Sequence, residues 1–232
     1  FVFVWVGEGE PTWNLPEFEG IKDGWSALVE FQMPLHARQQ NILENMVDFG
    51  HLELIHNVKD YQLKEIDVSE HVIKLTTQQR IERPELAKLV RFLSTIGIGW
   101  MFSFAREYNP SPEIQHRSLF GFSSSMEVDF SIIGVCGGIV HIKTNHGIAN
   151  KYVLRQLIFP SPAINGIVTY RTAFQFKRLD GRSFNGTLGG WLEKLLCKML
   201  ARGAYQEILN EMYLWESQVH QDTPKLAEGD GP

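Results

Sequence analysis

The stretch Gly166-Ile-Val-Thr-Tyr-Arg-Thr-Ala-Phe-Gln-Phe-Lys-Arg-Leu179 decides the fold class, because its side chains repeat with a period of two residues. The large side chains, with one threonine among them, fall at every second position: Val168, Tyr170, Thr172, Phe174 and Phe176. Successive side chains of a strand point to opposite faces, so the pattern predicts a β-strand with one buried face. The Asp180-Gly181 pair that follows is a turn signal.

The segments on either side of this strand complete an α+β pattern. Strand-like composition recurs in residues 25–33, 61–79, 119–130, 131–144 and 152–159, while residues 36–45 and 84–96 have helical spacing. A long helix follows residue 181. Residues 185–187 can cap it, and its apolar face is expected to consist of Trp191, Leu195, Met199, Leu209 and Met212. Several antiparallel strands packed on a C-terminal helix would form a sizeable apolar cavity, which is a candidate substrate pocket.

The composition excludes some functions and compartments. The 232 residues are 44% hydrophobic and 21% charged, as in ordinary globular proteins, and the net charge is −5. Without a positive excess the chain is not expected to bind nucleic acid. Cys136 and Cys197 lie in unlike surroundings and neither belongs to a CxxC pair, which favours a reducing compartment. We therefore expect a cytoplasmic location, with any membrane association provided by regions outside this sequence.

The most informative motif is Glu44-Asn-Met-Val-Asp48-Phe-Gly-His51-Leu-Glu-Leu-Ile-His56. On a helix Asp48 and His51 would share a face, whereas His51 and His56 would diverge by about 140°. Both imidazoles would reach one metal ion only if the helix contained a π-bulge or a break. Spacing alone therefore leaves a second interpretation open, in which His51 is a buried structural histidine and His56 is solvated.

The full string E-N-x-x-D-x-x-H-x-x-x-x-H resembles the mononuclear iron motif of Rieske non-haem oxygenases. The resemblance implies that His51 and His56 are iron ligands, that Asp48 is the bridging aspartate and that Asn45 is the motif asparagine. The start, Phe1-Val-Phe-Val-Trp5, resembles the exit from the Rieske domain in the same family. The end, from Asn210 to Pro232, resembles the C-terminal segment of its ketosteroid 9α-hydroxylase-like, sterol desaturase-like branch. The resemblance implies that residues 1–232 are an α+β catalytic domain of the helix-grip type, with a curved antiparallel sheet around the long C-terminal helix.

The third iron ligand of that branch is an aspartate four residues before a tryptophan. Glu211 stands at this position, four residues before Trp215. A glutamate still offers a carboxylate oxygen, so a facial triad with two histidines can form, although the longer side chain must fold differently. Glu207, one helical turn earlier, is the alternative ligand.

The resemblance also implies partners that this chain does not contain. A [2Fe–2S] Rieske cluster needs two cysteines and two histidines, and the two cysteines here are too far apart to hold it. The apolar strand-like start at Phe1 suggests that the chain begins inside a larger protein, with the cluster domain upstream. Electrons would then come from the cluster of a neighbouring subunit in a homotrimer, through Asp48, and a reductase or ferredoxin would supply that cluster. O2 and a bulky apolar substrate, steroid-like by analogy, would be consumed in a hydroxylation or desaturation at Fe(II).

Two other functions remain open at this stage. A lipid-binding or sterol-binding module on the same architecture would keep the cavity and lack the metal. A zinc hydrolase would use His51 and His56 as ligands, with Asp48 or Glu53 as the base. A second metal site at His141 and His146 is less favoured than a strand-end and a turn histidine.

Overall fold

The computed structural model describes residues 8–10, 23–56, 58–69, 71–82, 123–134, 136–144, 152–162, 164–181 and 188–218. Its centre is one antiparallel sheet of seven strands in the order β1-β7-β6-β5-β4-β3-β2. The strands are β1 Val29–Leu35, β2 Val58–Val68, β3 Val72–Glu82, β4 Ser123–Ile133, β5 Gly137–Thr144, β6 Tyr152–Ile158 and β7 Val168–Arg178. The first strand thus pairs with the last, and β2 forms the opposite edge.

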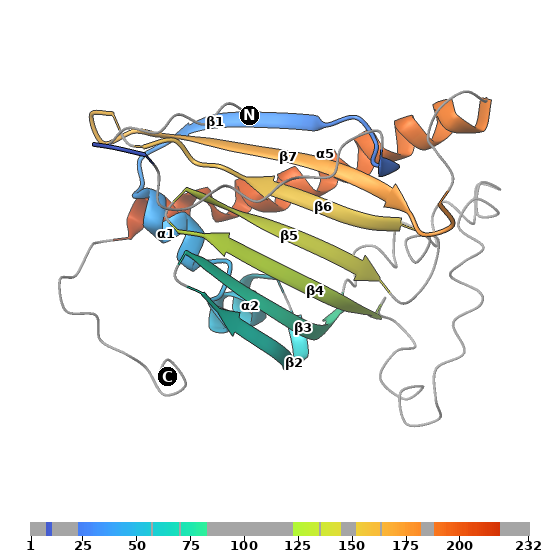
Figure 1. Cartoon of the computed structure of the whole chain (residues 1–232), viewed down its shortest axis with the longest axis horizontal. Coiled ribbons are helices and arrows are strands. Elements are labelled where there is room, and N and C mark those ends of the chain that lie inside the picture. The colour runs from blue at the N-terminus through green and yellow to red at the C-terminus, as the bar shows by residue number, and fades with distance from the viewer. Residues whose placement is uncertain are drawn as a thin grey trace.

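A single long helix, α5 (Leu188–Ser217), crosses one face of this sheet (Figure 1). Two short helices, α1 (Gln39–Glu44) and α2 (Phe49–His56), connect β1 to β2. A curved antiparallel sheet that holds a C-terminal helix is the helix-grip arrangement, so the predicted α+β helix-grip fold is confirmed. No helix in the described part of the chain is long and apolar enough to cross a membrane.

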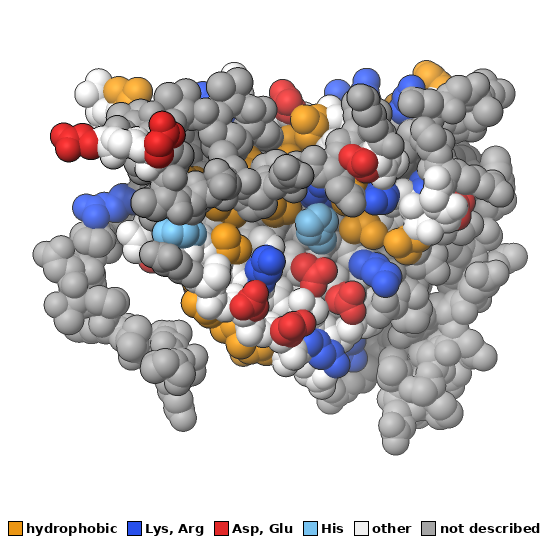
Figure 2. Space-filling model, in the orientation of Figure 1, with side chains coloured by type: hydrophobic (Ala, Val, Ile, Leu, Met, Phe, Trp, Pro, Cys, Tyr) orange, Lys and Arg blue, Asp and Glu red, His pale blue; other side chains and the backbone are white. Residues whose placement is uncertain are grey.

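The alternation predicted for residues 166–179 is present in β7. Val168, Tyr170, Phe174 and Phe176 are buried in the main core together with residues of α5. Thr172, on the same face, is also buried. Residues 61–79, expected to form one or two strands, contribute to the pair β2 and β3. The sheet face away from α5 carries charged side chains, and Figure 2 shows acidic and basic groups intermingled over β2 to β4.

The apolar face predicted for the C-terminal helix is wrong in its first half. The buried side of α5 contains Cys197, Ala201, Ile208 and Trp215, at helical spacing. Leu209 and Met212 pack partly against this core. Trp191, Leu195 and Met199 are instead 61%, 44% and 62% exposed. The reason is that these three residues lie on the side of α5 turned away from Cys197 and Ala201, which face the core.

Other expectations lie partly or wholly outside the described residues. The helix expected at 84–96 and the cap expected at 185–187 fall among residues that the structure does not describe. The helix expected at 36–45 is the shorter α1, and the motif downstream of it forms α2.

Candidate metal centre

The histidine motif forms the helix α2, and Asp48 caps its N-terminus. The Asp48 Oδ1 atom accepts a hydrogen bond from the backbone N–H of His51 at 3.0 Å. This contact satisfies one of the amide groups that lack a partner in the first turn of a helix. The Asp48 carboxylate is exposed and contacts the backbone of His51 rather than its imidazole.

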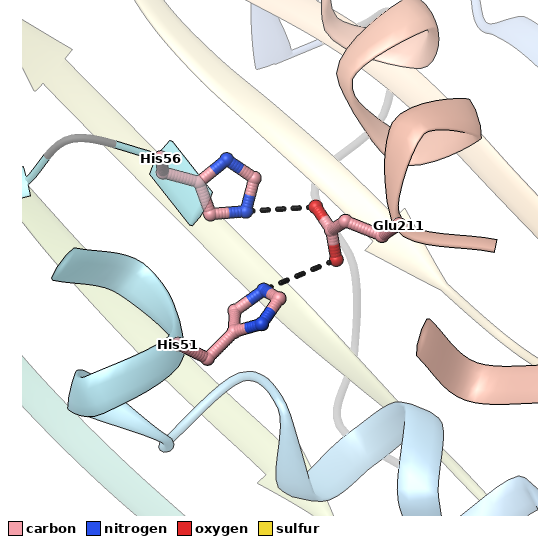
Figure 3. A group of neighbouring side chains, drawn as sticks. All are labelled: His51, His56 and Glu211. Carbon is pink, nitrogen blue, oxygen red and sulfur yellow. Dashed lines mark ion pairs between the residues drawn. The ribbon is translucent and has the colours of Figure 1, made fainter. Parts of the chain in front are cut away.

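The break or π-bulge expected between the two histidines is absent, because residues 49–56 form a continuous α-helix. His56 is the last residue of that helix, and the two imidazole rings lie 5.1 Å apart at a steep angle. His51 projects from within the helix and His56 from its last residue. The two imidazoles therefore reach a common point, and the backbone between them stays helical (Figure 3).

Glu211 of α5 lies at that common point. Its Oε1 atom is 2.7 Å from His56 Nε2, and its Oε2 atom is 3.3 Å from His51 Nε2 (Figure 3). Glu211 is only 6% exposed, although it carries a charge. The structure thus brings together the three residues expected as metal ligands, from two helices far apart in sequence.

Opposing effects act on the pKa of the Glu211 carboxyl. Burial raises this pKa, because a charged carboxylate loses its hydration. Hydrogen bonds from His51 and His56, together with the charges of their imidazoles, lower it more strongly, and the net pKa lies below its usual value. Glu211 is therefore an anion at neutral pH, as a metal ligand must be.

The donor set fits a divalent transition metal. One ligand atom from each of His51, His56 and Glu211 lies within 4.8 Å of the other two. Metal bonds of about 2.0–2.2 Å at right angles place neighbouring donors ~3 Å apart, close to the observed imidazole–carboxylate distances. Two imidazoles and one carboxylate form the facial set typical of non-haem Fe(II), with the opposite positions open.

The three residues lie in the wall of a cavity of about 240 Å³. Aliphatic and aromatic side chains from the sheet form most of the lining, among them Val128, Phe130, Ile142 and Ile158. Asn45 also contributes, and its Nδ2 atom is buried without a hydrogen-bond partner among the described residues. An apolar cavity with a few polar groups is the usual form of a small-molecule site.

Three polar residues of the cavity wall were not singled out from the sequence as site residues. Gln79, Gln156 and Tyr170 come from β3, β6 and β7, and all line the cavity. Burial raises the pKa of the Tyr170 phenol well above its usual range, and the charge of Glu211 raises it further. A glutamine within an otherwise apolar strand face is the signal that could have identified Gln79 and Gln156.

Several other candidates lie away from the three residues. Neither Asp48 nor Glu53, the bases considered for a hydrolase, lines this cavity, and both are exposed. His141 belongs to β5 and packs against Trp25 with ring centres 5.9 Å apart. His146 and the side chain of Glu207 lie outside the described residues.

Comparison with known proteins identifies the family. The family model of the 3-ketosteroid 9α-hydroxylase C-terminal domain matches residues 3–122, slightly more than half of the 232 residues. This match and the helix-grip fold place the chain among the catalytic domains of Rieske-type oxygenases, as the motif predicted. The chain belongs to the 3-ketosteroid 9α-hydroxylase C-terminal domain family. None of the curated proteins matches it significantly.

Solved structures with a similar chain path are distant in sequence. Dicamba monooxygenase bound to dicamba is 14% identical with a TM-score of 0.44, over 93% of this chain and 57% of that one. The structure of Ara h 8.0201 is 9% identical with a TM-score of 0.46, over 82% and 99%. The Zhui aromatase/cyclase from Streptomyces sp. R1128 is 8% identical with a TM-score of 0.42, over 81% and 89%. The chain spans little more than half the length of the monooxygenase.

Proposed function

We propose that the chain is the iron-binding catalytic domain of a Rieske-type oxygenase that oxidises a bulky apolar, steroid-like substrate with O2. The reaction would be a hydroxylation or a desaturation. The observation that carries this proposal is the group of His51, His56 and Glu211 in the wall of an apolar cavity. Membership of the 3-ketosteroid 9α-hydroxylase C-terminal domain family supports the substrate class.

His51 and His56 would hold Fe(II) through their Nε2 atoms, and Glu211 would hold it through its carboxylate. When bound, the iron would supply the activation of O2 at positions that the three ligands leave open. Glu211 would offset part of the charge of a bound metal, and its lowered pKa keeps the carboxylate available at neutral pH.

The cavity wall would position the substrate and exclude water. Side chains such as Val128, Phe130 and Ile158 give the substrate an apolar surface beside the three ligands. Asn45 lies in the cavity wall, and its amide N–H lacks a partner among the described residues. This group would therefore be available to donate a hydrogen bond near the reacting centre. A bulky hydrocarbon skeleton suits these walls better than a small charged substrate does.

Asp48 would connect the site to an electron donor. Its carboxylate is exposed, next to the helix that carries both histidines, and can therefore meet another subunit. We propose that it contacts a histidine of the [2Fe–2S] cluster in the neighbouring subunit of a homotrimer. The cluster domain would lie upstream of this chain, and a reductase or ferredoxin would reduce it. The isolated chain would then bind iron without turning over.

Iron binding by variants tests the proposal. The chain is loaded with Fe(II) anaerobically, desalted and analysed for metal, alongside His51→Ala, His56→Ala and Glu211→Ala. We expect about one iron per chain in the wild type and a loss in all three variants. His36→Ala is the matched control, because His36 is an exposed histidine outside the cavity. A folded wild-type chain that binds no iron above background would exclude the oxygenase site and favour a lipid-binding module.

A further inference from the structure

The first half of α5 exposes a row of large apolar side chains. Trp191, Leu195 and Met199 follow one another at four-residue spacing and are 61%, 44% and 62% exposed. Leu200, on another side of the helix, is also 44% exposed. The side of the helix that carries Cys197 and Ala201 is buried in the core. The outer row of Trp191, Leu195 and Met199 is not part of that core. Scattered single apolar residues on a surface need no explanation, whereas contiguous exposed apolar patches mark interaction sites.

A row of basic side chains runs beside the apolar row. Lys194, Lys198 and Arg202 have the same four-residue spacing and are all exposed. Three residues correspond to 300° on a helix, so the two rows lie about 60° apart. None of the three cations forms an ion pair with a residue that the structure describes.

The local charge is opposite to that of the whole chain. Residues 188–202 contain three basic residues and one acidic residue, Glu193, which gives a local net charge of 3 − 1 = +2. The whole chain has a net charge of −5. An anionic surface would therefore be repelled by most of the molecule and attracted by this segment.

From these two rows we propose that the first half of α5 docks on the surface of an anionic lipid bilayer. A helix with tryptophan and aliphatic residues beside lysine and arginine is suited to lie in the membrane interface. Its apolar row would enter the boundary of the acyl chains, and the basic row would contact anionic headgroups. The first turns of α5 extend past the ends of the described strands (Figure 1).

This docking is separate from the proposed iron chemistry. A bilayer is where bulky apolar molecules accumulate, so docking would bring the cavity close to such a substrate. Only this connection between docking and the supply of substrate rests on the proposed function. The vesicle experiment below needs no iron and no turnover, so its failure would leave the iron proposal standing.

Vesicle binding of the full 232-residue chain tests the proposal. Flotation with phosphatidylcholine vesicles containing phosphatidylglycerol is compared with flotation on pure phosphatidylcholine. We expect binding to the anionic vesicles only, with affinity falling as salt is raised from low to physiological concentration. Trp191→Ser/Met199→Ser and Lys194→Glu/Lys198→Glu should each lower the partition coefficient by at least about tenfold.

Two controls separate docking from other effects. Tyr213→Ser alters a 63% exposed aromatic residue on the same helix outside the two rows, and it should bind vesicles like the wild type. His36→Ala, a change of an exposed histidine outside the cavity, should also bind normally. Absence of binding to anionic vesicles would overturn the proposal. Equal binding by the Trp191→Ser/Met199→Ser variant would also overturn it. A dimer that this variant dissociates, without vesicle binding, would assign the row to contacts between copies of the chain.

Discussion

Glu211 Oε1 and His56 Nε2 lie 2.7 Å apart, although α5 and α2 come from opposite ends of the described chain. The second oxygen of the same carboxylate lies 3.3 Å from His51 Nε2. The buried carboxylate of Glu211 thereby links the long helix α5 to both histidines of α2. The three residues therefore come together only when α5 packs in its place in the tertiary structure.

Replacing this carboxylate should lower stability even without metal. Glu211→Gln keeps the size of the side chain but removes the charge that both imidazoles contact. We expect the metal-free variant to lose about 1.5–3 kcal/mol of unfolding free energy at pH 7, measured by urea denaturation. Glu216→Gln, an exposed change five residues further on, keeps an oxygen that can accept the hydrogen bond from the His36 backbone N–H and should lose less than about 0.5 kcal/mol. Equal losses in the two variants would contradict a special role for Glu211.

Asp48 has two roles that can be separated by substitution. Asp48→Ala removes the N-cap of α2 and should cost about 0.5–2 kcal/mol. Asp48→Asn keeps a capping oxygen while removing the charge, so its stability should stay close to that of the wild type. Under the proposed function, the Asn variant would bind iron normally yet lose turnover in the complete oxygenase with its reductase. Normal turnover of Asp48→Asn would show that the charge carries no electron-transfer role.

The adjacent glycines of β5 should respond differently to alanine. A methyl group at Gly137 would overlap the Phe159 ring and the backbone carbonyl of Ile158. Since the backbone cannot move freely, Gly137→Ala should cost about 1–3 kcal/mol. At Gly138 the overlap is with the end of the flexible Met46 side chain. Gly138→Ala should therefore cost less, which parallel urea unfolding curves would measure.

Gly138→Ala should nevertheless disturb the site. Met46 is buried beside Asn45 and lines the cavity, so its displacement changes the wall near the ligands. We expect weaker Fe(II) binding in this variant than its small loss of stability would explain. A variant that binds iron like the wild type would show that Met46 moves without affecting the cavity.

The predictable parts of the structure are those with a local signal. The alternation of β7 could be read directly, because its faces differ sharply in polarity. The three ligands could be predicted from the resemblance to the oxygenase motif, and the structure brings them together, whereas their role as ligands remains a prediction. Spacing alone was misleading, because it suggested a distorted helix between His51 and His56 where the structure has a regular one.

The parts that could not be predicted depend on how distant elements pack together. The helix α5 has apolar residues on two sides, and only its packing in the tertiary structure decides which side becomes buried. The rings of Trp215 and of Tyr170 in β7 stack with their centres 5.4 Å apart, whereas Trp191 is 61% exposed. Gln79 and Gln156 resemble ordinary strand residues in the sequence, and only the assembled sheet shows that both line the cavity.

The buried phenol of Tyr170 should make the fold sensitive to alkali. Its pKa is raised above the usual range, first by burial and then by the charge of Glu211. Above pH ~10 the unfolded chain therefore releases a proton that the folded chain retains, so stability falls as pH rises, by up to about 1.4 kcal/mol per unit. Tyr170→Phe should lose stability less steeply between pH 9 and 11, as followed by urea unfolding. The chain has six tyrosines, so the Tyr170 signal is taken as the difference in absorbance at 295 nm between wild type and variant. That difference should appear only on unfolding; a normal titration near pH 10 in the folded state would contradict the burial of this phenol.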